Sequence, residues 1–334
     1  MTTVKKKVVV IGGGTGTYTI LRGLAAHADT IDITAIVTMA DSGGSTGRLR
    51  DEFGQLPVGD VRMALSALAT DVDAQADLVR ELFLYRFDKG EGLAGHNFGN
   101  LLLTALTDIV GDTSTAIETA AQILRVQGKV IPVTTDNVHL MATYNTGTIL
   151  VGEHEIDVPS LGSHTDRIVT LEVTPKATAN QKAVLAILEA DLIILGPGDI
   201  YTSILANCVV DGMAAALSVT TARLVYVCNL MSRSGQTIGM HSRDYVDEIE
   251  KYIGRRPNYM IYNSVTFQES LLSKYVTEGN HPVENNCSIN DTCTVVASDV
   301  VSTESYVSVA GDIIERSLIR HDSKKLARAV LALL

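Results

Sequence analysis

VVVIGGGTGT, residues 8–17, is the stretch that decides the fold. Four consecutive apolar residues are typical of a parallel strand that is buried on both faces. The glycines that follow let the backbone turn tightly and approach a phosphate, which would face the free N–H groups at the start of the next helix. The candidate ligand contacts of this first loop are Gly12, Gly13, Gly14, Thr15, Gly16 and Thr17.

The first loop matches neither of two common nucleotide-binding fingerprints. The pattern G-x-G-x-x-G is met at Gly12 and Gly14 but has Thr17 at its third glycine position, and no Gly-Lys-Ser/Thr follows for a P-loop. We therefore interpret the loop as a general cradle for a phosphate. A tight turn without a ligand is the alternative, but four glycines in five residues disfavour it because each of them costs backbone entropy.

Two further glycine-rich loops follow apolar runs that have the length of strands. Residues 33–37 lead to the second loop and residues 191–195 lead to the third. In an open α/β sheet, ligands bind beyond the carboxyl ends of the strands, so we expect backbone amides from all three loops to converge on one diphosphate. The candidate contacts are Asp41, Ser42, Gly43, Gly44, Ser45 and Arg48 in the second loop, and Gly196, Pro197, Gly198, Asp199, Tyr201 and Thr202 in the third.

Composition argues against several classes of protein. The 334 residues are 46% apolar, and the net charge of −11 argues against a general nucleic-acid binder, which needs a basic face. No run reaches the ~18 apolar residues of a membrane helix, so we expect a cytoplasmic protein without a membrane span. The four cysteines include no Cys-x-x-Cys pair, so free thiols and no metal site are expected of them.

The order of the apolar runs predicts one α/β domain over residues 1–334, with a doubly wound and mostly parallel sheet. Alternating residues on either side of Asn145-Thr146-Gly147 predict a hairpin, and we expect a small antiparallel insertion over about 130–174. The patterns over residues 265–334 predict a C-terminal segment that completes the ligand site.

Polar side chains beside the loops are candidates for binding, each with a structural alternative. Asp41 follows the second strand, where a carboxylate would hydrogen-bond a ribose, hold Mg²⁺ on a phosphate, or only cap a turn. Asp60 is equally well explained as the N-cap of a helix over Val61–Ala69. Arg48 is a candidate fork for a phosphate. Further candidates are Arg62, Asn97, Asn100, Asn229, Met231, Tyr275 and Arg320.

Seven motifs occur in order along the chain: GGGTG at 12–16, DSGGSTGRLR at 41–50, GDVR at 59–62, GHNFGNLL at 95–102, GPGDIYTS at 196–203, NLM at 229–231 and RHD at 320–322. Together they resemble the YvcK-like family, the gluconeogenesis factors, which is related to CofD, the 2-phospho-L-lactate transferase. The resemblance implies a Rossmann-like fold and a cytoplasmic protein.

For function, the resemblance implies a regulatory protein that binds a nucleotide sugar such as UDP-N-acetylglucosamine and is needed for cell shape and wall synthesis during gluconeogenic growth. It gives Tyr275 and Arg320 as contacts to that ligand and the glycine loops as the cradle of its diphosphate. A cell-wall synthesis or regulatory protein is the expected partner, and a homo-oligomer is left open.

Two alternatives stand beside this expectation. A CofD-like enzyme would use Mg²⁺ to transfer a phospholactate-type group, with Asp41 and Asp60 as candidates for contact with the metal or the acceptor. Only one carboxylate precedes Gly43, and aromatic residues are 5% of the chain, which weakens this alternative. The other alternative is a protein that binds NAD through the Gly12 loop and Asp41 without turnover.

Overall fold

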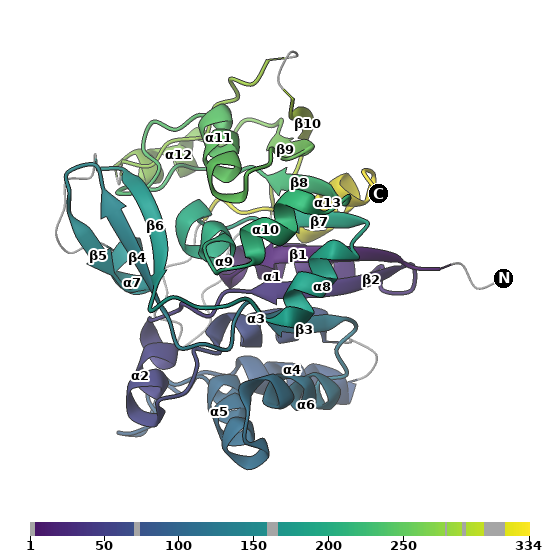
Figure 1. The fold of residues 1–334 in the computed structure, drawn as a ribbon, viewed down its shortest axis with the longest axis vertical. Coiled ribbons are helices and arrows are strands. Elements are labelled where there is room, and N and C mark those ends of the chain that lie inside the picture. Colours follow the sequence, from purple (N-terminus) through teal and green to yellow (C-terminus); the bar gives the residue numbers. More distant parts are fainter. Residues whose placement is uncertain (1–3, 70–73, 159–165, 278, 289–291, 304–317) are drawn as a thin grey trace.

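A parallel sheet forms the centre of the protein (Figure 1). The computed structural model describes residues 4–69, 74–158, 166–277, 279–288, 292–303 and 318–334. Within these ranges the sheet has seven strands: β1 (Lys6–Gly12), β2 (Ile31–Val37), β3 (Lys129–Pro132), β7 (Leu192–Leu195), β8 (Arg223–Val227), β9 (Tyr259–Asn263) and β10 (Thr294–Ser298). Their order is β10-β9-β8-β7-β1-β2-β3, and every neighbouring pair is parallel.

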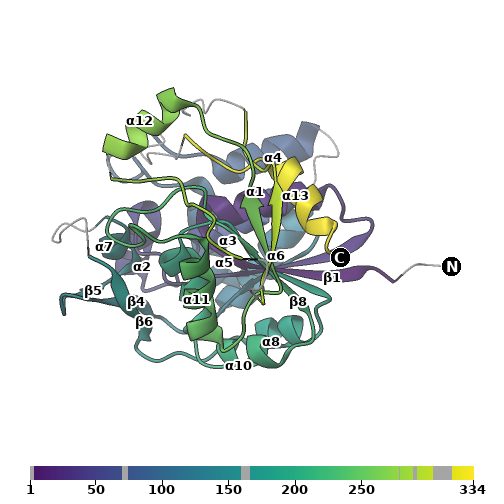
Figure 2. The same cartoon turned by 90° about the horizontal axis from the view of Figure 1, so that it is seen from above.

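Helices cover both faces of this sheet, as Figure 2 shows. One layer contains α1, α3 and α13, and the opposite layer contains α8, α10 and α11. The helices are α1 (Gly14–Ala25), α2 (Gly44–Phe53), α3 (Gly59–Leu68), α4 (Ala74–Leu84), α5 (Phe98–Val110), α6 (Thr113–Ile123), α7 (Glu153–Asp157), α8 (Gln181–Leu188), the π-helix η1 (Ile200–Leu205), α9 (Ala206–Cys208), α10 (Met213–Val219), α11 (Ser242–Ile253), α12 (Glu269–Thr277) and α13 (Ser323–Leu331). The predicted doubly wound fold is confirmed.

The strand order changes direction between β1 and β7. The connection from β1 leads outward to β2 and β3, whereas β7 leads to β8, β9 and β10 on the other side. All four residues of β7 are buried, as is the carboxyl half of β1, because helices cover both faces there. Such a change of direction opens a crevice beyond the carboxyl ends of the two strands, and the first and third glycine loops follow these two ends.

A second, smaller sheet is antiparallel, in the order β5-β4-β6. Its strands are β4 (His139–Tyr144), β5 (Ile149–Val151) and β6 (Ile168–Thr174), so the predicted hairpin around Asn145-Thr146-Gly147 is confirmed. The predicted start of the insertion near residue 130 is wrong, because β3 pairs with β2 in the large sheet. The smaller sheet therefore begins at His139 and carries α7 between β5 and β6.

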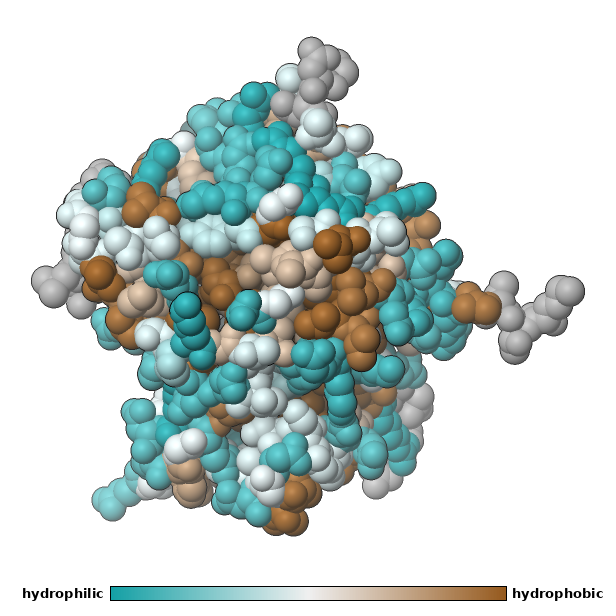
Figure 3. Space-filling view, in the orientation of Figure 1, coloured by the Kyte–Doolittle hydropathy of each residue, from teal (hydrophilic) through white to brown (hydrophobic). Residues whose placement is uncertain are grey.

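Side chains of apolar residues reach the surface on the side seen in Figure 3. Brown areas lie over the region of α8 and α10 in this view. The large exposed apolar residues of these two helices are Leu185, Leu188 and Val219. In the described part of the chain, every helix is too short or too polar to span a lipid bilayer.

Candidate functional site

The first and third glycine loops are in direct contact. A Cβ atom built on Gly16 would lie 2.1 Å from the carbonyl oxygen of Pro197 and 2.8 Å from the amide nitrogen of Gly198. Only a glycine at position 16 lets α1 begin this close to the loop after β7. The two loops therefore meet at the carboxyl edge of the sheet, as predicted.

Asp60 lies beneath the first loop. Its Oδ1 accepts a hydrogen bond of 2.9 Å from the amide of Gly14, and a Cβ atom on Gly13 would lie 2.3 Å from its Oδ2. The prediction that Asp60 is an N-cap is wrong, because α3 already begins at Gly59 and Val58 occupies the capping position. The carboxyl group of Asp60 instead accepts a hydrogen bond from outside α3 and stabilises the turn of the first loop.

The second loop places Asp41 near Asp60. The Oδ1 of Asp41 accepts a hydrogen bond of 2.9 Å from the amide of Gly43, and its Oδ2 would lie 2.4 Å from a Cβ atom on Gly59. Burial and the charge of Asp41 raise the pKa of Asp60 to about 7, and burial raises that of Asp41 as well. Both residues are half-buried, and they lie by the crevice that the strand order opens beyond β1 and β7, which is called the cleft below.

The insertion brings a third carboxyl group to this cleft. The amide of His154 donates a hydrogen bond of 3.0 Å to the Oγ of Ser42, so the start of α7 sits on the second glycine loop. Burial, followed by the charges of Asp41, Asp157 and Asp60, raises the pKa of Glu153 to about 9. Sequence reasoning missed Glu153, since no pattern shows where residues of an insertion fold back.

A fourth and a fifth carboxyl group lie beside the third loop. Asp199 directly follows Gly198, and burial together with the charge of Asp157 raises its pKa to about 6. Asp157, at the end of α7, accepts hydrogen bonds from Thr202 and from two residues of the loop after β8. Tyr201 is placed away from the cleft, because it is 2% exposed and its hydroxyl lies 3.4 Å from the carbonyl oxygen of Ile168.

A buried polar network holds the second loop against α5. Asn97, a candidate ligand contact, caps α5 and accepts hydrogen bonds from the amides of Gly99 and Asn100. Asn100 accepts from the Nε of Arg62 at 2.9 Å and donates to the hydroxyls of Ser45 and Thr46 at 3.3 Å. Ser45 also lies 3.1 Å from the Nδ1 of His96, whose pKa burial lowers. The hydroxyl of Ser45 thus faces protein groups.

Replacing Asn100 with alanine tests this network. The substitution removes an acceptor from a nearly buried guanidinium, so we expect the free energy of unfolding to fall by about 1–2 kcal/mol. Urea unfolding followed by circular dichroism measures the change. The exposed truncation Ile109→Ala on the same helix is the control, with an expected change below ~0.5 kcal/mol. Equal effects of the two variants would contradict a structural role for Asn100.

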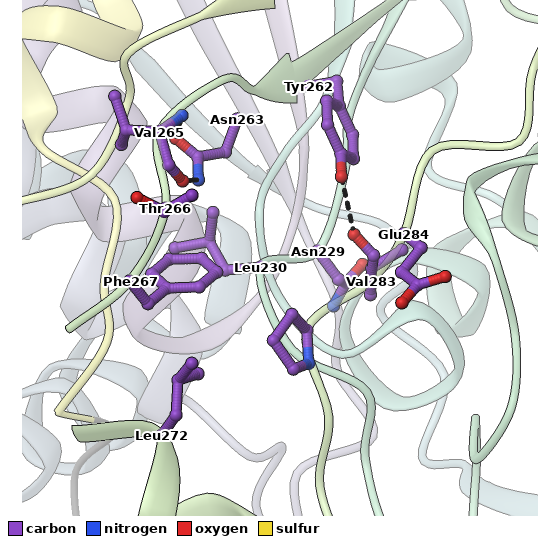
Figure 4. A pocket seen from close by; sticks show the side chains of 11 residues that line it. Asn229, Leu230, Tyr262, Asn263, Val265, Thr266, Phe267, Leu272, Val283 and Glu284 are labelled. Atoms are coloured by element: carbon purple, nitrogen blue, oxygen red, sulfur yellow. Dashed lines mark hydrogen bonds between the residues drawn. The ribbon is translucent and has the colours of Figure 1, made fainter. Parts of the chain in front are cut away.

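A pocket of about 250 Å³ lies at the carboxyl ends of β8 and β9 (Figure 4). Its wall includes apolar side chains and the rings of Tyr262 and Phe267. Asn229 joins this pocket to the third loop, because it lines the pocket and its Nδ2 donates a hydrogen bond of 2.8 Å to the carbonyl oxygen of Gly198. The lining residues are Asn229, Leu230, Tyr262, Asn263, Val265, Thr266, Phe267, Leu272, Pro282, Val283 and Glu284.

The other predicted contacts surround this pocket or the loops. Met231 pairs with Pro282, which lines the pocket. Tyr275 lies one turn along α12 from Leu272, and its hydroxyl accepts a hydrogen bond of 2.9 Å from the amide of Ile319, the neighbour of Arg320. The structure thus brings Tyr275 close to Arg320. Arg48 is exposed and donates to the carbonyl oxygen of Ala94 at 3.1 Å. The ligand-binding role of these residues stays a prediction.

The carboxyl groups of the cleft do not form a complete metal site by themselves. Among the described residues, no group of three or more histidine, cysteine, aspartate or glutamate side chains is arranged to hold a metal ion. Mg²⁺ is usually bound by one or two carboxylates together with phosphate oxygens and water. Asp41 and Asp60 fit this pattern, and the remaining ligands would come from a bound diphosphate.

Comparison with known proteins identifies the family. Residues 8–301 match the family model described as 2-phospho-L-lactate transferase CofD. The chain belongs to the CofD family. Within it, the match includes the three glycine loops, the insertion and the pocket, whereas Arg320 lies beyond the matched residues.

Relatives from several bacteria extend along nearly the whole chain. A putative gluconeogenesis factor from Thermotoga maritima is 38% identical over 97% of this chain and 98% of its own length. The gluconeogenesis factor of Bacillus subtilis is 36% identical over 99% and 98% of the two chains. A crystal structure of a protein from Bacillus halodurans is 35% identical, with a TM-score of 0.87 over 98% of this chain and all of that chain. The CofD family match thus covers residues 8–301, and the fold is shared with a solved structure over 98% of this chain.

Proposed function

We propose that this chain binds a nucleoside diphosphate linked to a sugar, with UDP-N-acetylglucosamine as the first ligand to test. The contact between Gly16 and Pro197 carries this proposal, because it places two glycine loops where one diphosphate would reach both. The base would occupy the neighbouring pocket, since apolar side chains and aromatic rings suit a flat ring. Asn229 would fix the position of the base relative to the diphosphate, because it lines the pocket and is hydrogen-bonded to the third loop.

The proposal includes an Mg²⁺ ion that binds together with the nucleotide. Asp41 and Asp60 in their ionised forms would repel a bare diphosphate, since charges of the same sign at short distance oppose binding. Glu153, with a pKa of about 9, would stay neutral near pH 7. A divalent ion held by Asp41 and Asp60 would neutralise the phosphate oxygens and bridge them to the cleft. The protein's own groups would then orient the ligand, and the amides of the glycine loops would stabilise its charge.

The role in the cell that fits this ligand is regulation of carbon metabolism and wall synthesis. The relatives from Thermotoga maritima and Bacillus subtilis bear the name gluconeogenesis factor, which supports this role. A CofD-like transferase is the second candidate. The family match over residues 8–301 and the neighbouring Asp41 and Asp60 favour it.

Calorimetric titration tests the proposal. We expect UDP-N-acetylglucosamine to bind at least ~10-fold more tightly with Mg²⁺ than without it, because the ion offsets the charge repulsion. The double variant Asp41→Asn/Asp60→Asn is expected to lose this dependence on Mg²⁺, whereas Asp211→Asn, an exposed control, should keep it. Absence of heat at millimolar ligand would contradict the proposal, and tighter binding of NAD would replace the nucleotide sugar with a dinucleotide. Product formed from a deazaflavin and an activated phospholactate would favour the transferase.

A further inference from the structure

An arginine that belongs to none of the glycine loops lies beside the third of them. Arg233 follows Asn229 in the loop after β8, and its Nη2 lies 3.2 Å from the Oδ2 of Asp157. The side chains of the two residues are 38% and 25% exposed, so the ion pair faces solvent at the cleft. Ion pairs with this much exposure contribute little to stability, which means that a competing anion can exchange with one partner at low cost.

The carboxylate that pairs with Arg233 is fixed by further hydrogen bonds, and the Nη2 of Arg233 also lies 3.3 Å from the backbone carbonyl oxygen of Asp157. Asp157 accepts a hydrogen bond of 3.0 Å from the Nε2 of Gln236 and one of 3.3 Å from the Oγ1 of Thr202, in addition to its contact with Arg233. Thr202 belongs to η1, and Gln236 belongs to the same loop as Arg233. Asp157 would therefore keep two donors if Arg233 turned toward another anion.

The charge of Arg233 acts on Asp199, which lies in the loop after β7. It lowers the pKa of Asp199, against the larger effects of burial and Asp157 that raise it. Asp199 directly follows Gly198, whose carbonyl oxygen accepts the hydrogen bond from Asn229. Arg233 thus acts on Asp199, and Asp157 links it to Thr202 in the segment that follows the third glycine loop.

Arg62, whose charge acts on Asp41 and Asp60, is less suited to contact a ligand. Arg62 is 9% exposed, and its Nε already donates to Asn100. Arg233 has a more accessible guanidinium, and a guanidinium binds phosphate oxygens in a fork geometry that lysine does not offer.

We propose that Arg233 is a specificity-determining residue of the nucleotide site, which exchanges Asp157 for a phosphate oxygen of the bound diphosphate. This inference rests on the proposed function, since it concerns the same ligand. Arg233 would select nucleotides that carry phosphate over nucleosides that lack it. Asp157 would hold Arg233 in place before the ligand binds.

Binding of UDP-N-acetylglucosamine and of uridine to five proteins tests this inference: the unsubstituted chain, Arg233→Ala, Arg233→Lys, Asp157→Asn and the double variant of Arg233→Ala with Asp157→Asn. We expect Arg233→Ala to weaken the binding of UDP-N-acetylglucosamine by about 10- to 100-fold, because a charged hydrogen bond is lost. Asp157→Asn should increase the affinity for UDP-N-acetylglucosamine by about two- to fivefold, since the guanidinium of Arg233 no longer has to leave an ion pair. Binding of uridine should not change in either variant. Arg233→Lys should lie between Arg233→Ala and the unsubstituted chain.

The double variant separates exchange from a simple change in net charge. If Arg233 binds the phosphate, Asp157→Asn should give no gain in affinity once Arg233 is absent. An equal gain in both backgrounds would overturn the inference, as would a loss of affinity in both single variants, which would mean that the ion pair only closes the cleft. Failure of the unsubstituted chain to bind UDP-N-acetylglucosamine would instead refute the proposed function. Thermal unfolding of all variants identifies any that lose affinity through misfolding.

Discussion

Gly16→Ala is expected to lower the free energy of unfolding by about 3 kcal/mol and to abolish nucleotide binding. The added Cβ would lie 2.1 Å from the carbonyl oxygen of Pro197, and the other close atoms also belong to the backbone. No flexible side chain can move aside, so the first and third loops must separate. Urea unfolding and calorimetric titration with UDP-N-acetylglucosamine measure the two effects.

Gly128→Ala is the matched control for this prediction. A Cβ atom at Gly128 would lie 2.7 Å from the carbonyl oxygen of Ile33, where the chain enters β3. Its steric cost is also against backbone, but the contact lies away from the carboxyl edge of the sheet and the glycine loops. We therefore expect a comparable loss of stability with ligand affinity retained. Normal binding by Gly16→Ala would show that the junction of the loops does not form the site.

Glu153→Gln is expected to stabilise the protein at pH 8 by about 2 kcal/mol or more. The pKa of Glu153 is raised from 4.5 to about 9 in the fold, so the folded chain holds a proton that the unfolded chain releases in this range. A group of this kind contributes stability that is complete below pH 4.5 and is lost as the pH rises toward 9. Each pH unit in that range costs at most ~1.4 kcal/mol, and water in the cleft reduces this cost.

Urea unfolding from pH 4 to pH 9 measures this effect. The two proteins should be equally stable near pH 4, and the advantage of the glutamine variant should grow with pH. Glu155→Gln, which changes an exposed glutamate on the same helix, is the control and should give no growing advantage. A constant difference at every pH would mean that Glu153 is ionised in the folded protein. Asp60 and Asp199, with pKa values of about 7 and about 6, leave a residual decline in both proteins.

The parts of the site that follow strands could be predicted from the sequence. An apolar run before a glycine loop places that loop at the carboxyl edge of a parallel sheet, so the meeting of Gly16 with Pro197 followed from two local patterns. The cap at Asn97 also depends only on the residues that follow it. Local sequence patterns were enough to predict a contact where the two residues are close in the chain, or where both follow the ends of parallel strands.

The rest depends on contacts that local patterns do not describe. Asp60 has the residue type and position of an N-cap, but Gly14, from another element, supplies its hydrogen bond. Glu153 and Asp157 reach the cleft only because the insertion folds back on Ser42. Tyr201 follows a glycine loop, yet it lies inside the helical turn η1 and its side chain is buried. Each error concerns a side chain whose partner is distant in sequence.

The strand order has a consequence for how the protein is made. β2 follows β1 closely in the chain and covers one of its edges. The other edge of β1 pairs with β7, which begins only at Leu192. While the residues between β2 and β7 are being synthesised, the nascent chain thus presents an apolar strand with one unpaired edge, which is the form of intermediate that aggregates or recruits chaperones. Yield in a growing cell is therefore expected to depend on how quickly translation reaches β7.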